Sequence, residues 1–290
     1  MVPVLIGRLS LLASIARLHI VAIGAMGALT FGYAFTGERH YGVALLSALD
    51  WFVVNLLNRA VDLAEDTANR IHGADVAAKH RRLVLGTGLT VLLASLVVTA
   101  LVAPALLAPR LAFHALGLAY NWPMFGGRRI KQLYFWKNTA SATGFLLTCV
   151  ALPLVAAPHL LVSAPTIAAT ALFFVLFELS YEVLYDLRDV EGDRLAQVRT
   201  YPAVHGVATG WRVARGLMLA ASAVVFASFA AGLVPWRIAI MGVAPLLQLG
   251  WSVRVRRRGI SSKDCVAITW VGVALLAGWQ VWEALGLPGA

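Results

Sequence analysis

The stretch LLSALDWFVVNLLNRAVDLAED, residues 45–66, begins as a mostly apolar run and ends in three carboxylates and an asparagine. A carboxylate near lipid costs about 2.5–3.5 kcal/mol when it stands alone. The acids at the end of this run therefore need neutralising partners, a function, or both. The stretch predicts a membrane-spanning helix that leads directly into a polar site.

The composition of the whole chain agrees with a membrane protein. The 290 residues are 60% hydrophobic and 13% charged, whereas a soluble domain carries about 25% charged residues. Apolar stretches long enough to span a bilayer predict an all-α polytopic membrane protein, and Pro104 with the pair Pro109–Arg110 leaves eight spans as the alternative to nine. The nine candidate spans are 18–36, 41–57, 84–103, 105–121, 138–157, 164–185, 213–233, 236–253 and 264–286.

The distribution of positive charge predicts the orientation. The net charge is +10 with 24 lysines and arginines, and most of these fall in alternate connections, in the groups 8–17, 59–82, 128–137, 188–212 and 254–263. The intervening connections hold only Arg39, Arg110 and Arg237. This is the positive-inside pattern, so we expect a multi-pass protein of the cell inner membrane with its long polar loops in the cytoplasm. The basicity then requires no nucleic-acid partner.

Other features indicate a single unit. No linker or low-complexity tract interrupts the chain, so we expect one transmembrane domain over residues 1–290. The N-terminus shows no cleavage site for a signal peptide. Cys149 and Cys265 fall within predicted spans and suggest no disulfide framework.

Two acidic stripes stand at span ends on the same side of the membrane. At 100° per residue, Asn58, Asp62, Glu65, Asp66 and Asn69 fall within about a third of a helix circumference, with Asn55 one turn earlier. The second stripe occupies an arc of about 80° by the same rule and comprises Glu178, Glu182, Asp186, Asp189 and Asp193. Segments 54–66 and 181–193 superpose so that Asp62 and Asp66 match Asp189 and Asp193. Solvated helix ends with ion pairs to Arg59 and Arg188 are the simpler interpretation.

The oxygen-rich stripes nevertheless favour a metal. Carboxylates and amides without a histidine or cysteine cluster suit Mg²⁺, which is usually shared between a few protein carboxylates and substrate phosphates. The stretch RRIKQLYFWK, residues 128–137, adds four cations and no acid at the same edge. Arginine and lysine bind phosphate oxygens, so this stretch is either a membrane anchor or a clamp for a diphosphate.

At this point the sequence resembles the UbiA superfamily of intramembrane prenyltransferases. Asn58, Asp62 and Asp66 fit the family's N-x-x-x-D-x-x-x-D signature, although Arg59 occupies a position where an Asp is frequent. Asp189 and Asp193 fit the second signature, D-x-x-x-D. Further similarities are Arg17, the tyrosines Tyr181 and Tyr185, the pairs Arg129/Lys131 and Lys137/Asn138, and the segment RTYPAVHG at 199–206.

The resemblance implies a horseshoe of nine helices around a central cavity that is capped by cytoplasmic Asp-rich loops and opens sideways to lipid. It implies an Mg²⁺-dependent enzyme that ionises an isoprenyl diphosphate and transfers the prenyl cation to an aromatic or lipid acceptor. The implied metal ligands are Asn58, Asp62, Asp66, Asp189 and Asp193, with Tyr181 and Tyr185 beside the acids in the catalytic set. The implied diphosphate-binding residues are Arg17, Arg59, Arg70, Arg128, Arg129, Lys131, Lys137 and Arg194.

Several alternatives stay open at this stage. The same ionisation without an acceptor would make the protein a terpene cyclase, and a cation transporter or a protein inactivated by Arg59 are further alternatives. Aromatic faces stabilise cations, and Trp51 and Phe52 are placed to do so. Intramembrane acids are functional candidates by default, and the proton-accepting base is sought among Asp50, Glu178 and Glu182.

Overall fold

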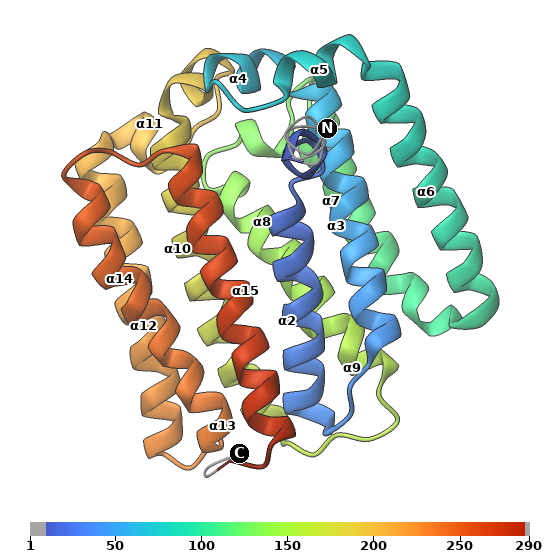
Figure 1. The fold of residues 1–290 in the computed structure, drawn as a ribbon, viewed down its shortest axis with the longest axis vertical. Coiled ribbons are helices and arrows are strands. Elements are labelled where there is room, and N and C mark those ends of the chain that lie inside the picture. Colours follow the sequence, from blue (N-terminus) through green and yellow to red (C-terminus); the bar gives the residue numbers. More distant parts are fainter. Residues whose placement is uncertain (1–9, 288–290) are drawn as a thin grey trace, which may run out of the picture.

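The computed structural model describes residues 10–287, and within that range the chain forms helices and no strand (Figure 1). The all-α prediction is confirmed. Arg8, counted in the first basic group, and the start of the chain, on which the prediction of no signal peptide rests, lie outside the described residues.

Eight helical segments are long and apolar enough to cross a membrane. They match eight of the predicted spans, and most helices run a few residues further into the polar connections than hydropathy indicates. Their bounds are α2 Leu18–Thr36, α3 Tyr41–Val61, α6 Arg81–Val102, α8 to α9 Trp136–Ala156, α10 Ala164–Leu195, α12 Val207–Ala230, α13 to α14 Trp236–Arg256 and α15 Ser262–Ala284.

The remaining predicted span, 105–121, is a separate helix of 15 residues. A 3-10 turn at Pro104–Leu106 ends the passage from α6, and α7 follows over Leu107–Asn121. At 15 residues α7 is shorter than the roughly 20 that a bilayer core requires. The two ends of the described chain nevertheless lie at opposite ends of the bundle (Figure 1), as an odd number of passes requires.

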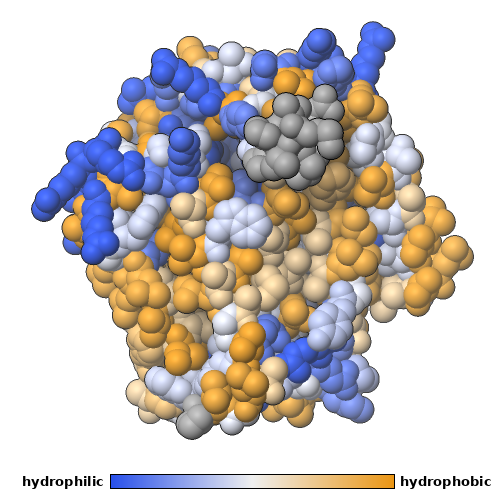
Figure 2. Space-filling view, viewed as in Figure 1, coloured by the Kyte–Doolittle hydropathy of each residue, from blue (hydrophilic) through white to orange (hydrophobic). Residues whose placement is uncertain are grey.

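The long polar connections gather at one end of the bundle. This end carries the short helices α4 (Leu63–Ala68), α5 (Ala74–Lys79) and α11 (Tyr201–His205), which lie across or beside the ends of the long helices (Figure 1). Figure 2 shows hydrophilic residues concentrated mainly at this end and a broad hydrophobic surface below it. The chain therefore presents a lipid-compatible band with a polar rim on one side.

The helices that position the site form an inner group. Packing contacts connect α2 to α3, α3 to α7, α7 to α8, α8 to α10, α10 to α15 and α15 back to α2. The half of this group away from the polar rim is filled by an aromatic core that includes Phe31, Phe35 and Phe173. Helix α6 packs on α3, and α12 packs on α10, outside the inner group (Figure 1).

A buried ion cluster joins α3 to α7. Asp50 is fully buried and accepts hydrogen bonds from Arg110 Nε at 3.1 Å, and its Oδ1 lies 2.9 Å from His114 Nε2. Arg110 Nη1 also donates to Thr99 of α6 at 2.6 Å. Both oxygens of Asp50 are engaged by Arg110 and His114, and Asp50 does not line the cavity described below. The prediction of Asp50 as a candidate proton-accepting base is therefore wrong for this geometry.

Candidate active site

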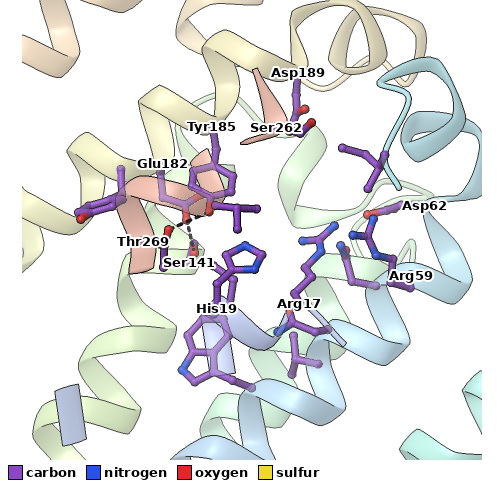
Figure 3. Close-up of a pocket in the computed structure, with 18 of the residues that line it drawn as sticks. Arg17, His19, Arg59, Asp62, Ser141, Glu182, Tyr185, Asp189, Ser262 and Thr269 are labelled. Carbon is purple, nitrogen blue, oxygen red and sulfur yellow. Dashed lines mark hydrogen bonds between the residues drawn. The ribbon is translucent and has the colours of Figure 1, made fainter. Parts of the chain in front are cut away.

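Both acidic ends line one cavity of about 790 Å³ inside the inner group. It is bounded by α2, α3, α7, α8, α10 and α15, and its polar end lies beneath α4. Side chains from segments far apart in the sequence face one another across it (Figure 3). All five residues predicted as metal ligands line this cavity, namely Asn58, Asp62, Asp66, Asp189 and Asp193.

The helical spacing predicted that the first acidic stripe lies on one helix, but the structure divides it between two. Helix α3 ends at Val61, and Asp62 (φ −87°, ψ 29°) separates it from α4. The break turns α4 across the bundle end (Figure 1). The amide of Asp66 still donates to the carbonyl of Asp62 at 2.8 Å, so the two aspartates stay on consecutive turns and both reach the cavity.

Two cations from the connection before α8 hold the first acids of this stripe. Lys131 is 2% exposed, and its Nζ lies 2.6 Å from both Asp62 Oδ1 and Glu65 Oε2. Arg129 donates from Nη1 to Asp62 Oδ1 at 2.9 Å and from Nη2 to Glu65 Oε1 at 2.6 Å. The basic stretch 128–137 therefore reaches the acidic end of the bundle through Arg129 and Lys131.

Asp66 is held by two guanidinium groups. Arg59 Nη1 donates to Asp66 Oδ2 at 2.6 Å, and Arg17 Nη2 lies 3.7 Å from Asp66 Oδ1. Arg17 adopts a left-handed conformation (φ 47°, ψ 51°) directly before α2, which costs about 1–2 kcal/mol for a residue other than glycine. Arg17 and Arg59 both line the cavity beside Asp62 (Figure 3).

The second acidic stripe lies on one continuous helix, α10, as predicted. Asp189 accepts a hydrogen bond from Arg188 Nε at 2.6 Å and a second from the same guanidinium. Lys137 Nζ lies 2.8 Å from Asp186 Oδ1 and 3.0 Å from Asp193 Oδ1. Asp186 is fully buried behind the cavity wall, where Asn138 Nδ2 also donates to it at 2.7 Å.

A direct contact joins the two acidic ends. Asn69, which follows α4, accepts a hydrogen bond from the backbone amide of Gly192 at 3.0 Å. A β-carbon at position 192 would stand 2.3 Å from Asn69 Nδ2. Gly192 is therefore needed for this close approach. Asn69 belongs to the predicted stripe, but nothing in its spacing reveals a partner 123 residues away.

Away from the polar rim the cavity wall becomes aromatic and acidic. Trp51 stands eleven positions before Asp62, and Glu178 stands eleven positions before Asp189. At the helical rise this places Trp51 and Glu178 about 16 Å below the rim aspartates. Trp51 stacks on Phe145 with 4.1 Å between ring centroids. These residues line the cavity together with Phe113, Ser141, Tyr181, Glu182 and Tyr185.

Several polar side chains in this deeper part of the cavity form hydrogen bonds with neighbouring helices. Glu182 accepts a hydrogen bond from Ser141 Oγ at 2.8 Å (Figure 3). The hydroxyl of Tyr185 lies 2.9 Å from Thr269 Oγ1, and that of Tyr181 donates to the carbonyl of Ile268 at 3.3 Å, so both tyrosines are anchored to α15. Glu178 and Glu182 remain cavity-facing acids, in contrast to Asp50.

Five residues predicted to bind the diphosphate or to stabilise the carbocation do not line this cavity. Arg70 is exposed, and Phe52 on α3 does not reach the wall. Arg128 and Arg194 are exposed and line a second, smaller pocket of about 350 Å³, with Arg199. Arg129 acts on the acids from behind the cavity-lining residues. Spacing along the chain placed the four arginines near the rim and Phe52 beside Trp51, but it could not assign the direction of each side chain.

The donor set fits a hard divalent cation that shares its coordination with a ligand. Within residues 10–287 no three Asp, Glu, His or Cys side chains converge tightly enough to hold a metal by themselves. Mg²⁺ typically takes only one or two carboxylates and completes its shell with water and phosphate oxygens. Asn58 Oδ1 is buried at the cavity without a hydrogen-bond partner, which leaves an amide oxygen free for such an ion.

The sequence of the chain matches the model of the UbiA prenyltransferase family over residues 21–273. The protein therefore belongs to the UbiA prenyltransferase family, and with its apolar helices it is a multi-pass integral membrane protein. No curated protein matches the chain in sequence.

Solved structures agree on the fold. A UbiA homologue from Archaeoglobus fulgidus bound to DMAPP and Mg²⁺ is similar with a TM-score of 0.69 and 14% identity, over 92% of this chain and 96% of that one. The same homologue bound to GPP and Mg²⁺ gives a TM-score of 0.68 at 14% identity, again over 92% and 96%. A structure concerning digeranylgeranylglyceryl phosphate synthase gives 0.54 at 14% identity, over 94% and 95%. At these identities the similarity establishes the fold alone.

Proposed function

We propose that this protein is an Mg²⁺-dependent intramembrane enzyme that ionises an isoprenyl diphosphate and transfers the prenyl group to an acceptor, with its acidic rim facing the cytoplasm. One observation carries the proposal. Asp62 and Asp66 share a single cavity with Asp189 and Asp193, and the same cavity continues into an aromatic chamber. The homologue from Archaeoglobus fulgidus binds DMAPP or GPP together with Mg²⁺, which supports a prenyl diphosphate as the substrate class.

The polar rim accounts for ionisation of the substrate. The cavity-facing cations Arg17, Arg59, Lys131 and Lys137 supply donors for diphosphate oxygens and stabilise the charge that develops on the leaving group. When bound through Asn58, Asp62, Asp66, Asp189 or Asp193, Mg²⁺ would neutralise further charge on the diphosphate. Tyr181 and Tyr185, anchored to α15, line the wall between this rim and the chamber.

The chamber accounts for the fate of the prenyl group. Its aromatic faces, with Trp51, Phe113 and Phe145, stabilise a carbocation and exclude water. Glu178 and Glu182 are the cavity-facing carboxylates closest in depth to these rings, and either can accept the proton that is lost after attack. The acceptor is an aromatic or lipid molecule that enters this chamber.

The same chamber supports a terpene cyclase as the second candidate. The aromatic lining together with two acids at Glu178 and Glu182 suits a cation that attacks its own double bonds as well as one captured by an acceptor. An acceptor that carries a carboxylate would meet two acids there, so an uncharged acceptor suits the transferase and no acceptor suits the cyclase.

Mass spectrometry of products separates the two candidates. Purified protein in nanodiscs is supplied with C10, C15 or C20 diphosphate and Mg²⁺, with and without an extract of the host's aromatic and lipid pool. Release of diphosphate with a prenylated acceptor supports the transferase, and a cyclic hydrocarbon or alcohol without any acceptor supports the cyclase. No diphosphate release from any substrate, with cation flux in proteoliposomes, would identify a transporter instead.

A further inference from the structure

The two acidic ends carry the same number of ion-paired carboxylates but different numbers of cations paired with them. The α3–α4 end has three acids and the α10 end has three, whereas the cations paired with them number four and two. At the α3–α4 end the acids Asp62, Glu65 and Asp66 pair with Arg17, Arg59, Arg129 and Lys131. At the α10 end the acids Asp186, Asp189 and Asp193 pair with Arg188 and Lys137. One end is formally cationic by one charge and the other anionic by one, before Glu178 and Glu182 extend the negative side.

The excess positive charge is concentrated at Asp66. Arg59 is 4% exposed, and Asp66, its carboxylate partner, is 5% exposed and is shared with Arg17. Arg59 Nε is buried and has no hydrogen-bond acceptor. Arg17 and Arg59 both line the cavity (Figure 3). Because they share one carboxylate, they leave a net positive charge and unused N–H donors there. A buried, unsatisfied donor of this kind is costly, and a phosphate oxygen would satisfy it with a charge-assisted hydrogen bond.

The α10 end offers the opposite environment. Asp189 and Asp193 both line the cavity, and their local cations are outnumbered by carboxylates. Lys263 also lines the cavity, from α15, but its side chain is exposed and forms no salt bridge with either end among the described residues. A divalent cation is attracted to the α10 end and repelled by the paired guanidinium groups at the other.

We propose that the substrate diphosphate is held asymmetrically: guanidinium groups of Arg17 and Arg59 bind its oxygens directly on the α3–α4 side, and a single divalent cation binds on the α10 side through Asp189 and Asp193. The proposal rests on the proposed function, because it assigns the groups that bind the diphosphate of that reaction. Asp66 is then a positioning residue that orients two arginines, and Arg59 takes the place of a metal-binding site. Asn58 is neutral and can add an amide oxygen to the cation without changing this charge balance.

The number of bound cations tests the proposal without turnover. Purified protein in nanodiscs is titrated with Mn²⁺ in the presence of geranyl S-thiolodiphosphate, a substrate analogue that ionises very slowly, and bound Mn²⁺ is measured by electron paramagnetic resonance. We expect one Mn²⁺ per chain in the wild type. We expect the same number in Asp66→Asn and none in Asp189→Asn. Retention of the thermal unfolding midpoint shows in each case that the variant is folded.

Replacement of Arg59 by an acid gives the most decisive test of the number of bound cations. Arg59→Asp removes one cation and adds one carboxylate, so we expect the number of bound Mn²⁺ to rise from one to two. The matched control Arg82→Asp makes the same charge change at an exposed position of α6 and should leave the number at one. Two Mn²⁺ in the wild type, or equal losses of Mn²⁺ in Asp66→Asn and Asp189→Asn, would overturn the asymmetric assignment.

Binding without any metal tests the arginine side by itself. In excess EDTA the wild type should still bind the radiolabelled analogue, and Arg59→Gln should weaken this binding at least tenfold. Equal metal-free affinity in Arg59→Gln and the wild type would also overturn the assignment. Failure of the proposed function looks different, because a wild type that binds the analogue neither with Mn²⁺ nor in EDTA has no diphosphate site at all.

Discussion

The α3–α4 and α10 ends of the cavity start from nearly the same sequence pattern and reach different chemistry. Both run from an apolar span into aspartates four residues apart, and both face one cavity. At the first end the helix breaks at Asp62, and its acids pair with Arg59 of α3 and with Arg17 and Arg129 from two other segments of the chain. At the second end α10 continues through all its acids and supplies Arg188 from its own sequence. Similar spacing therefore does not imply the same role.

The largest expected effect is at the α10 end. Asp189→Asn keeps the shape of the side chain and removes the charge that holds a cation, so diphosphate release from geranyl diphosphate should fall about 1,000-fold, in line with the loss of a main electrostatic contact. Coupled phosphate detection with pyrophosphatase measures the release. Asp75→Asn, exposed on α5, is the matched control. Activity within tenfold of the wild type in Asp189→Asn would remove Asp189 from the metal set.

The corresponding change at the α3–α4 end should cost less. Asp66→Asn leaves Arg17 and Arg59 in the cavity but removes the carboxylate that orients them, so kcat/KM should fall by about 10- to 30-fold, or about 1.4–2 kcal/mol. The Mg²⁺ concentration for half-maximal rate should stay that of the wild type. A large increase in this Mg²⁺ requirement would show that Asp66 is itself a ligand and that the two ends are equivalent.

The contact that joins the two ends should have a smaller effect. Gly192→Ala forces the Asn69 side chain to move, because the new β-carbon would stand 2.3 Å from its Nδ2. A flexible side chain can yield, so we expect a stability loss below about 1 kcal/mol and a roughly fivefold loss of activity. The double variant with Asn69→Ala provides the test, since residues in contact are non-additive. A fully additive double variant would mean that the contact does not couple the ends.

The smallest effect on ionisation is expected deeper in the cavity. Glu178 lies about 16 Å below Asp189 along α10 by the helical rise, which is too far to bind the leaving group. We therefore consider the variant Glu178→Gln. Diphosphate release should stay within about threefold of the wild type, whereas the product distribution should shift if this carboxylate accepts the proton. Gas chromatography with mass spectrometry measures the products, and Glu182→Gln is the parallel variant. Unchanged products in both would exclude these glutamates as the base.

Local patterns predicted most of the fold because hydrophobic length is a local property. The apolar stretches at 18–36 and 164–185 correspond to α2 and α10 nearly to the residue at their starts. The break at Asp62 was not predicted, because the polar residues on both sides keep helical spacing across it. The count of nine spans is not established, since α7 has only 15 residues.

Side-chain direction explains why some of the basic residues predicted at the site reach it and others do not. Lys131 and Lys137 were predicted at the site and lie there: Lys131 is buried against Asp62 and Glu65, and Lys137 is half-buried against acids of α10. Arg128 is adjacent to Arg129 in sequence, yet it is exposed in another pocket while Arg129 reaches Asp62. Composition and spacing report which residues stand near the rim, but neighbouring residues in a connection point in different directions.

The amino-acid sequence alone determined that the chain is a helical membrane protein with two acidic ends on one side. Apolar length, charge asymmetry and helical spacing are properties of the linear sequence and do not depend on tertiary contacts. Only the tertiary structure decided which cation neutralises which acid. Asp66 meets Arg17 and Arg59, Asp193 meets Lys137, and Asp50 is occupied by Arg110 rather than open to the cavity. Apart from Arg59–Asp66, which are seven residues apart, these pairings join segments distant in sequence, and the energies of all of them depend on burial and separation in space.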